Sequence, residues 1–158
     1  QIIGESGVAK ASLYEHFPSK EAILQAYLDD ATALWRNEFE EFARSRGGGE
    51  KTILALFDYR KQLAVRRGFK GCTFVRVVYE LPRLDETALG IVLRHKEYVR
   101  KMLKENIALL AGRRTAKEAE DLLEMILTLY EGCGVQSSLE RSARPIDNAR
   151  KIAQKLMQ

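Results

Sequence analysis

Cysteine and histidine are scarce in this sequence, and their scarcity argues against several kinds of site. Its 158 residues include only two cysteines, Cys72 and Cys133, which lie far apart. Two isolated cysteines provide neither a disulfide framework nor a zinc-ligand spacing, and His95 stands without ligand-spaced partners. We therefore expect no metal site, no cofactor and a reducing cytoplasm as the location. The thiols could instead sense oxidants, but that requires exposure and a lowered pKa, so we favour buried, inert thiols.

Long apolar runs are also missing. No stretch approaches the ~18–20 apolar residues that a membrane span requires, and no signal peptide is recognisable, so we expect no membrane partner. Proline is rare, with three residues, while 46% of the chain is apolar, which is typical of an ordered domain with a sizeable core. The length suits one domain, or one domain with a small appendage.

The charge balance is mildly basic and is compatible with a nucleic-acid partner without identifying one. The formal net charge is +4 at pH 7. Residues 1–20 do not carry this excess, because their two lysines are matched by two glutamates. The densest basic run lies downstream and consists of Arg60, Lys61, Arg66, Arg67 and Lys70.

The N-terminal stretch has the pattern of a helix-turn-helix. Residues 1–6 are typical of a helix end, Gly7 supplies a tight turn, and a two-turn helix is expected over 10–17 before Pro18 and Ser19 begin another helix. The short helix has an apolar side for packing. Its other side carries groups able to bond phosphates or base edges: Lys10, Ser12, Tyr14, Glu15 and His16.

Residues 1–28 resemble the TetR family of transcriptional regulators, most specifically through Leu-Tyr-Glu-His-Phe-Pro-Ser-Lys at positions 13–20. The resemblance implies a further helix upstream of residue 1, so we expect this chain to be N-terminally incomplete. It also implies two domains: the remainder of a DNA-binding head over 1–28, and a ligand-binding and dimerisation body over 29–158. The expected contacts with double-stranded operator DNA are made by Lys10, Ala11, Ser12, Tyr14, Glu15, His16 and Lys20.

Chemistry assigns roles within this set. The Ser12 and Tyr14 hydroxyls and His16 would hold phosphates, as would Lys20, whose family counterpart does so. Lys10 could bond guanine O6 and N7. A dimer would present two such helices to half-sites ~34–36 Å apart, so the operator should be near-palindromic. Packing inside the head is the alternative for Tyr14 and His16.

The rest of the chain is expected to be all helical. Apolar residues recur at spacings of three and four over 19–44, 50–67 and 85–111, with a flexible glycine linker at 47–49 between the first two helices. Residues 72–81 are β-branched but have no second strand to pair with, so we expect a buried helix there. A capping box at Thr115 and Glu118 begins the next helix, and Pro145 begins the last.

In the resembled family the body holds an effector and the last two helices form a dimer. Apolar and aromatic candidates favour a hydrophobic small-molecule effector. Arg76 could meet an anionic group, although pairing with Glu80 is the more frequent role of such a residue. The candidate effector-binding residues are Phe57, Tyr59, Cys72, Val75, Arg76, Tyr79, Tyr98, Met102 and Tyr130.

Self-association is expected because the helix after Thr115 is apolar on two sides. Two glycines inside that helix, Gly132 and Gly134, are expected to let another backbone approach closely. A monomeric bundle is the alternative. The candidate homodimer contacts are Leu122, Leu123, Ile126, Leu129, Cys133, Ile152 and Leu156.

Together these patterns predict an all-α, homodimeric DNA-binding regulator, most simply a repressor that an effector releases from its operator. A second hypothesis is an all-helical small-molecule-binding protein or enzyme without DNA binding. We do not expect an enzyme, because no constellation of catalytic groups stands out. A third hypothesis is a DNA-binding regulator without an effector.

Overall fold

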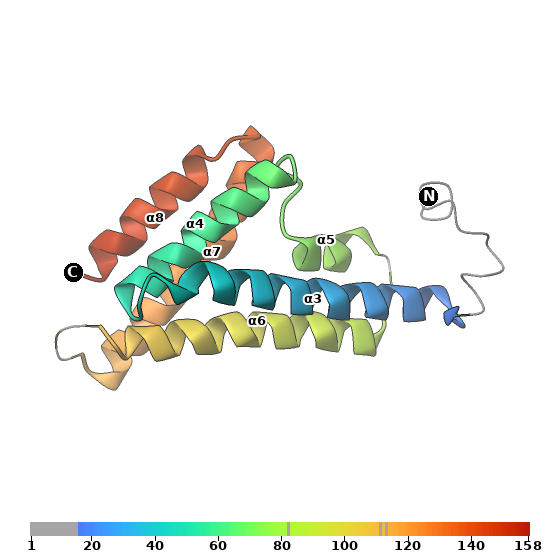
Figure 1. The fold of residues 1–158 in the computed structure, drawn as a ribbon, viewed down its shortest axis with the longest axis horizontal. Coiled ribbons are helices and arrows are strands. Elements are labelled where there is room, and N and C mark those ends of the chain that lie inside the picture. The colour runs from blue at the N-terminus through green and yellow to red at the C-terminus, as the bar shows by residue number, and fades with distance from the viewer. Residues whose placement is uncertain (1–15, 82, 111, 113) are drawn as a thin grey trace.

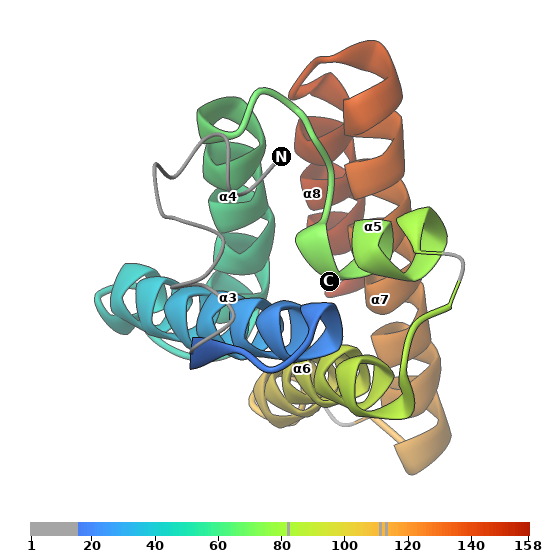
Figure 2. The same cartoon turned by 90° about the vertical axis from the view of Figure 1, so that its right-hand side faces the viewer.

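A computed structural model describes residues 16–81, 83–110, 112 and 114–158. The described residues form six α-helices and no strand, which confirms the all-α prediction. Two long helices, α3 (Lys20–Arg44) and α6 (Glu86–Ile107), lie side by side (Figure 1). A second group made of α4 (Glu50–Arg66), α7 (Ala116–Glu140) and α8 (Arg144–Leu156) runs across that pair (Figure 2). The short helix α5 (Thr73–Glu80) lies beside α6.

The helix α3 begins at the predicted cap. The Ser19 side chain accepts a hydrogen bond from the backbone amide of Ala22 at 3.1 Å, which satisfies a donor that the first turn leaves free. The helix buries Leu28, Trp35 and Phe39 against the rest of the chain. It continues without a break across residue 28, the predicted domain boundary. A rigid-body movement of this helix in the body would therefore also move its N-terminal end, on the predicted DNA-binding side of the boundary.

The turn after α3, where the three glycines predicted a flexible linker, contacts α6 through Gly49. Gly49 is buried, has a φ of 65°, and donates its backbone N–H to Asn106 Oδ1 at 2.9 Å. It is the N-cap of α4. Glycine is required here because this left-handed conformation is unfavourable for other residues, and the contact with α6 fixes the turn.

The helix α5 is present as predicted, but its predicted burial is wrong. Of its eight described residues only Phe74 is buried, and Tyr79 is 83% exposed. The helix packs on α6 along one side, so its β-branched residues follow the single-face pattern of a surface helix. Arg76 lies on its exposed side and pairs with Glu80 at 2.9 Å, the alternative weighed for it.

Caps also define the later helices. The Asp85 side chain accepts from the Ala88 amide at 2.9 Å and begins α6, which ends at Ile107, four residues before the predicted end. The predicted capping box of Thr115 and Glu118 is present at the start of α7. Pro145 lies in the first turn of α8, where its missing N–H costs no helical hydrogen bond.

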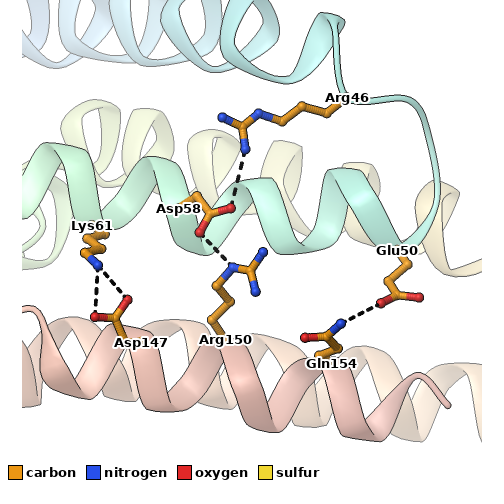
Figure 3. Close-up of polar contacts among 7 residues, drawn as sticks. All are labelled: Arg46, Glu50, Asp58, Lys61, Asp147, Arg150 and Gln154. Carbon is orange, nitrogen blue, oxygen red and sulfur yellow. Dashed lines mark hydrogen bonds and ion pairs between the residues drawn. The ribbon is translucent and has the colours of Figure 1, made fainter.

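A row of polar contacts fixes α8 on α4 (Figure 3). Lys61 Nζ lies 2.9 Å from Asp147, and Asp58 is bridged by Arg150 Nε at 2.7 Å and by Arg46 at 3.4 Å. These side chains are partly exposed, so each pair contributes about 0–1 kcal/mol to folding. Most of the free energy comes from the apolar side of α8, where Ile146, Ala149 and Ala153 are buried. We call this contact the α4–α8 seam.

The core has two parts. The larger cluster joins α3, α4, α6, α7 and α8 around Phe39, Phe57 and Leu103. The smaller one joins α3, α5 and α6 around Leu28 and Phe74. Among the described residues, no helix combines the length and apolar character that crossing a membrane would need.

Candidate functional site

A cavity of about 70 Å³ lies where α4 ends and the chain turns into α5. Residues from all six described helices line it together with the loop over 67–72. Its apolar lining is formed by Trp35, Leu63, Ala64, Phe69, Phe74, Val99 and Ile146, and its polar lining includes Arg60, Arg67, Lys70, Cys72, Thr73, His95, Lys96, Tyr130, Ser137 and Ser138. Such a mixture of apolar walls and a few polar groups is typical of a small-molecule site.

Arg60 is the most unusual of these residues. Its side chain is only 11% exposed, and its guanidinium carbon lies 3.5 Å from the centre of the Tyr130 ring. The nearest carboxylate oxygen, on Glu131, is 3.8 Å away, which is long for an ion pair. Its Nε is buried and has no hydrogen-bond partner. Burial opposes the charged form of Arg60, but the neighbouring Tyr130 and Glu131 keep its pKa raised, so the side chain stays a cation.

A glycine on α7 makes room for this cation. A Cβ built at Gly134 would collide with the guanidinium of Arg60, whereas one at Gly132 would meet nothing within 4 Å in this chain. The prediction that these glycines admit another backbone is therefore wrong for Gly134, which admits a side chain. The close approach explains why a residue with low helix propensity occupies the middle of a long helix.

The other charged groups around the cavity are also cationic. Arg67, Lys70 and Lys96 line it with Arg60, and none of the described lining residues is an aspartate or glutamate. The carboxylate of Glu131 lies beside the cavity and is 2.7 Å from Lys96 Nζ, so one partly exposed acid faces two cations. The cavity therefore has an excess of positive charge.

An aromatic group forms the wall towards α3 and α5. The His95 ring stacks on Phe74 with ring centres 3.7 Å apart and meets the edge of Trp35 at 5.0 Å. Only 4% of His95 is exposed, and burial lowers its pKa to about 4. His95 is therefore neutral at pH 7 and belongs to the wall rather than to the basic set.

The two cysteines have different surroundings. Cys72 lines the cavity and its Sγ lies 3.9 Å from Lys96 Nζ. Cys133 is buried in the larger core cluster, and burial raises its pKa to about 11. The predicted buried, inert thiol fits Cys133, while Cys72 is only partly buried.

The structure brings together only two of the predicted effector residues. Cys72 and Tyr130 line the cavity, whereas Val75 and Tyr79 line a separate, open groove beside α6 and α7. The other five lie elsewhere, and of these Arg76 is exposed on α5 and paired with Glu80. Phe57, Tyr59 and Met102 are buried in the larger core cluster, and Tyr98 donates from its hydroxyl to Glu40 at 2.8 Å.

Arg60 was missed because it was assigned to a basic run. One signal in the sequence could have identified it: it lies three residues after Phe57 and three before Leu63, on the apolar side of its helix. A charged residue on an apolar helical face needs a special environment.

The predicted DNA contacts fall largely on undescribed positions. Lys10, Ala11, Ser12, Tyr14 and Glu15 lie outside the described residues, and the helix-turn-helix with them. His16 and Lys20 are described and both are exposed, with Lys20 at the first position of α3. Their role in DNA binding stays a prediction.

The predicted dimer contacts divide into two groups. Leu122, Leu123, Ile126 and Cys133 are buried in the core of the single chain. Leu129 and Leu156 pack partly against that core, and Ile152 is 46% exposed. Further apolar side chains on α7 are exposed, namely Met125, Val135 and Leu139. A partner would therefore meet mainly this exposed set.

No described residues form a group of three or more histidine, cysteine or acidic side chains positioned to hold a metal ion. The positive cavity is thus the site with the most developed chemistry in the described part of the chain.

Comparison with known proteins agrees with the N-terminal motif. Residues 1–27 match the family model described as bacterial regulatory proteins, tetR family. Over 156 residues the chain is 26% identical to the HTH-type transcriptional repressor NemR of Escherichia coli strain K12, covering 94% of this chain and 77% of the relative. NemR of Escherichia coli O6:H1 matches to the same extent.

The fold agrees as well. The crystal structure of the reduced form of E. coli NemR matches with a TM-score of 0.71 at 23% sequence identity, covering 96% of this chain and 81% of that one.

Proposed function

The resemblance to the TetR family is confirmed, and from that premise we propose that this protein is a homodimeric repressor that an effector releases from its operator. The observation that carries the proposal is the position of α3. This helix follows directly on the DNA-binding motif and, through Trp35, forms part of the wall of the cavity. A molecule in the cavity would therefore touch the helix that orients the DNA-binding head.

Hydrogen bonds and an ion pair join α3 to the neighbouring helices α4 and α6. A change in the packing around the cavity could therefore shift α3, and with it the DNA-binding head. The Tyr59 hydroxyl donates to Glu38 at 2.6 Å and Arg66 pairs with the same carboxylate at 2.7 Å, which joins α3 to α4. Gln25 donates to Asp85 at 3.0 Å and joins α3 to the start of α6. An effector would shift α3 only by binding its two positions with different affinity, because equal affinity shifts no equilibrium.

The residues that read DNA follow from the motif. Ser12, Tyr14, His16 and Lys20 are proposed to hold phosphates and Lys10 to bond a guanine, as their chemistry allows. Two heads on a homodimer would meet a near-palindromic operator. The exposed Val135, Leu139 and Ile152 of α7 and α8 support a partner surface on these helices.

We propose a cytoplasmic regulator and not an enzyme. The relatives are named as transcriptional repressors, and that role needs no reaction at the cavity. A small-molecule-binding protein without DNA binding remains the alternative, and the cavity by itself fits both functions.

Operator selection separates the two. The full-length protein is offered random duplexes, and the selected site is titrated by fluorescence anisotropy at several salt concentrations. We expect a near-palindromic site, a steep loss of affinity with salt, and at least tenfold weaker binding for Tyr14→Ala and Lys20→Ala. Lys117→Ala removes an exposed lysine from α7 and serves as the matched control. No selected site, or equal binding by all variants, would contradict the proposal.

A further inference from the structure

We propose that the cavity binds a small organic carboxylate with a short apolar body, and that Arg60 is the residue that pairs with the carboxylate. This inference rests on the proposed function, because it names the chemical class of the effector. It adds a carboxylate to the hydrophobic effector that the sequence predicted, and it assigns to Arg60 the anion-binding role that the sequence offered to Arg76.

The first argument is the incomplete pairing of Arg60. A guanidinium has five N–H donors in a planar arrangement, and in this structure Nε has no partner, the carboxylate of Glu131 stays 3.8 Å away, and the guanidinium otherwise lies over the Tyr130 ring at 3.5 Å. A buried charge that lacks partners is costly, so native proteins retain one where it has a use. An oxyanion in the cavity would supply charge-assisted hydrogen bonds to this group.

The second argument is the charge of the lining. Four cations, Arg60, Arg67, Lys70 and Lys96, surround the space, and Glu131 is the acid in contact with two of them. Because Glu131 already pairs closely with Lys96 at 2.7 Å, it neutralises Arg60 poorly. An additional negative charge would therefore be attracted into the cavity, and a cationic molecule would be repelled.

The third argument is the apolar remainder of the lining. Trp35, Phe74 and Val99 face the same space as Arg60, and Phe69 from the loop closes on it. An inorganic anion would leave these walls without contacts, whereas an aliphatic or aromatic body would bury apolar surface against them. The cavity of about 70 Å³ favours a body of only a few carbon atoms. These features together point to a short carboxylic acid.

Trp35 provides the signal for a direct test. It is the single tryptophan of the chain and lines the cavity, so its fluorescence reports on occupancy. The full-length protein is titrated with hexanoate, with hexanamide and with inorganic phosphate, and calorimetry confirms each binding constant. Hexanamide keeps the apolar body and removes the charge, and phosphate keeps a charge and removes the body. We expect hexanoate to bind at least tenfold more tightly than either.

Variants then locate the contact. Arg60→Gln should weaken hexanoate binding at least tenfold and leave hexanamide binding unchanged, and Arg60→Lys should lose less affinity. Arg76→Gln is the matched control, because Arg76 is exposed and pairs with Glu80 outside the cavity. Circular dichroism checks that each variant is folded, and the comparison of acid with amide in the unmodified protein does not depend on the variants.

The ligand-binding experiments and the operator-binding experiments can fail independently of each other. Equal binding of hexanoate and hexanamide, tighter binding of phosphate than of hexanoate, or unchanged hexanoate binding in Arg60→Gln would overturn the carboxylate site. Any of these results with a selected operator still bound would leave the regulator standing. Loss of operator binding with intact, Arg60-dependent hexanoate binding would instead contradict the regulator and leave the anion site.

Discussion

Arg60 and Lys61 are neighbours on α4, yet they lie in opposite environments. Lys61 reaches the α4–α8 seam, where its side chain is 44% exposed and lies 2.9 Å from Asp147 (Figure 3). Arg60 turns into the cavity, where its side chain is 11% exposed and its closest acid is 3.8 Å away. The paired, hydrated charge of the seam positions two helices. The charge in the cavity is buried, lies over the Tyr130 ring and has only a distant acid, and this difference is the reason we propose the cavity as the binding site.

The largest expected difference between the cavity and the α4–α8 seam is in how they make the free energy of unfolding depend on pH. The cavity wall contains His95, whose pKa changes on folding. Burial lowers the pKa of His95 to about 4 from an ordinary 6.5, so below pH 6.5 the unfolded chain takes up a proton that the folded chain resists. The free energy of unfolding should therefore fall as pH drops, by about 2 kcal/mol between pH 7 and 5 and by about 3 kcal/mol by pH 4. Urea denaturation between pH 7 and 5, above the range of the carboxylates, would isolate this term.

This pH dependence of the free energy of unfolding is expected to come from the His95 imidazole, so replacing His95 tests it. His95→Phe keeps an aromatic ring against Phe74 and should remove the dependence between pH 6.5 and 5. His16→Gln, at an exposed position, should retain it. A slope that survives in His95→Phe would contradict the assignment.

A smaller effect is expected from the glycines of α7. Gly134→Ala should displace Arg60, cost about 1–3 kcal/mol through overpacking, and weaken carboxylate binding. Gly132→Ala meets no atom within 4 Å and should gain up to about 1 kcal/mol from its higher helix propensity. Thermal and urea denaturation of the two variants, compared with the unmodified protein, would test this. Equal destabilisation by both would show that the space at Gly134 is not special.

A third prediction concerns the cost of the buried cation. Arg60→Met replaces it with an apolar side chain of similar length, and we expect the free energy of unfolding to rise by about 1 kcal/mol while carboxylate binding is lost. Stability would thus increase as function decreases. Denaturation and Trp35 fluorescence on the same samples measure both. A destabilisation of several kcal/mol would instead indicate that Arg60 is mainly structural.

The smallest effect should come from the seam. A double-mutant cycle with Lys61→Ala and Asp147→Ala is expected to give a coupling energy of about 0.5 kcal/mol, because both side chains are about 40% exposed. High salt should reduce it further. A coupling above about 2 kcal/mol would remove the contrast between the seam and the cavity.

The sequence predicted local features well. Ser19 and Thr115 cap helices as expected, since capping depends on a few neighbouring residues, and Pro145 lies in the first turn of α8, one position after the predicted one. It predicted tertiary features less well. The backbone N–H of Gly49 donates to Asn106, 57 positions away, and no local pattern records that contact.

The candidate site shows the same limit. The predicted effector residues include Cys72 and Tyr130, which line the cavity, but also core residues such as Phe57, because an aromatic residue has the same pattern in a core and in a pocket wall. Its place between Phe57 and Leu63 on the apolar side of α4 separates Arg60 from its basic neighbours, but the space that Gly134 leaves for its guanidinium is a tertiary feature that no local pattern records.

The most direct test of this account is whether a ligand bound in the cavity lowers the affinity of the protein for its operator. The full-length protein bound to its selected, fluorescent operator is titrated with hexanoate, with hexanamide as control, and anisotropy reports release. We predict that saturating hexanoate lowers operator affinity at least fivefold in the unmodified protein and leaves it unchanged in Arg60→Gln. Specific operator binding that hexanoate leaves unaltered while it occupies the cavity would contradict the link between cavity and DNA.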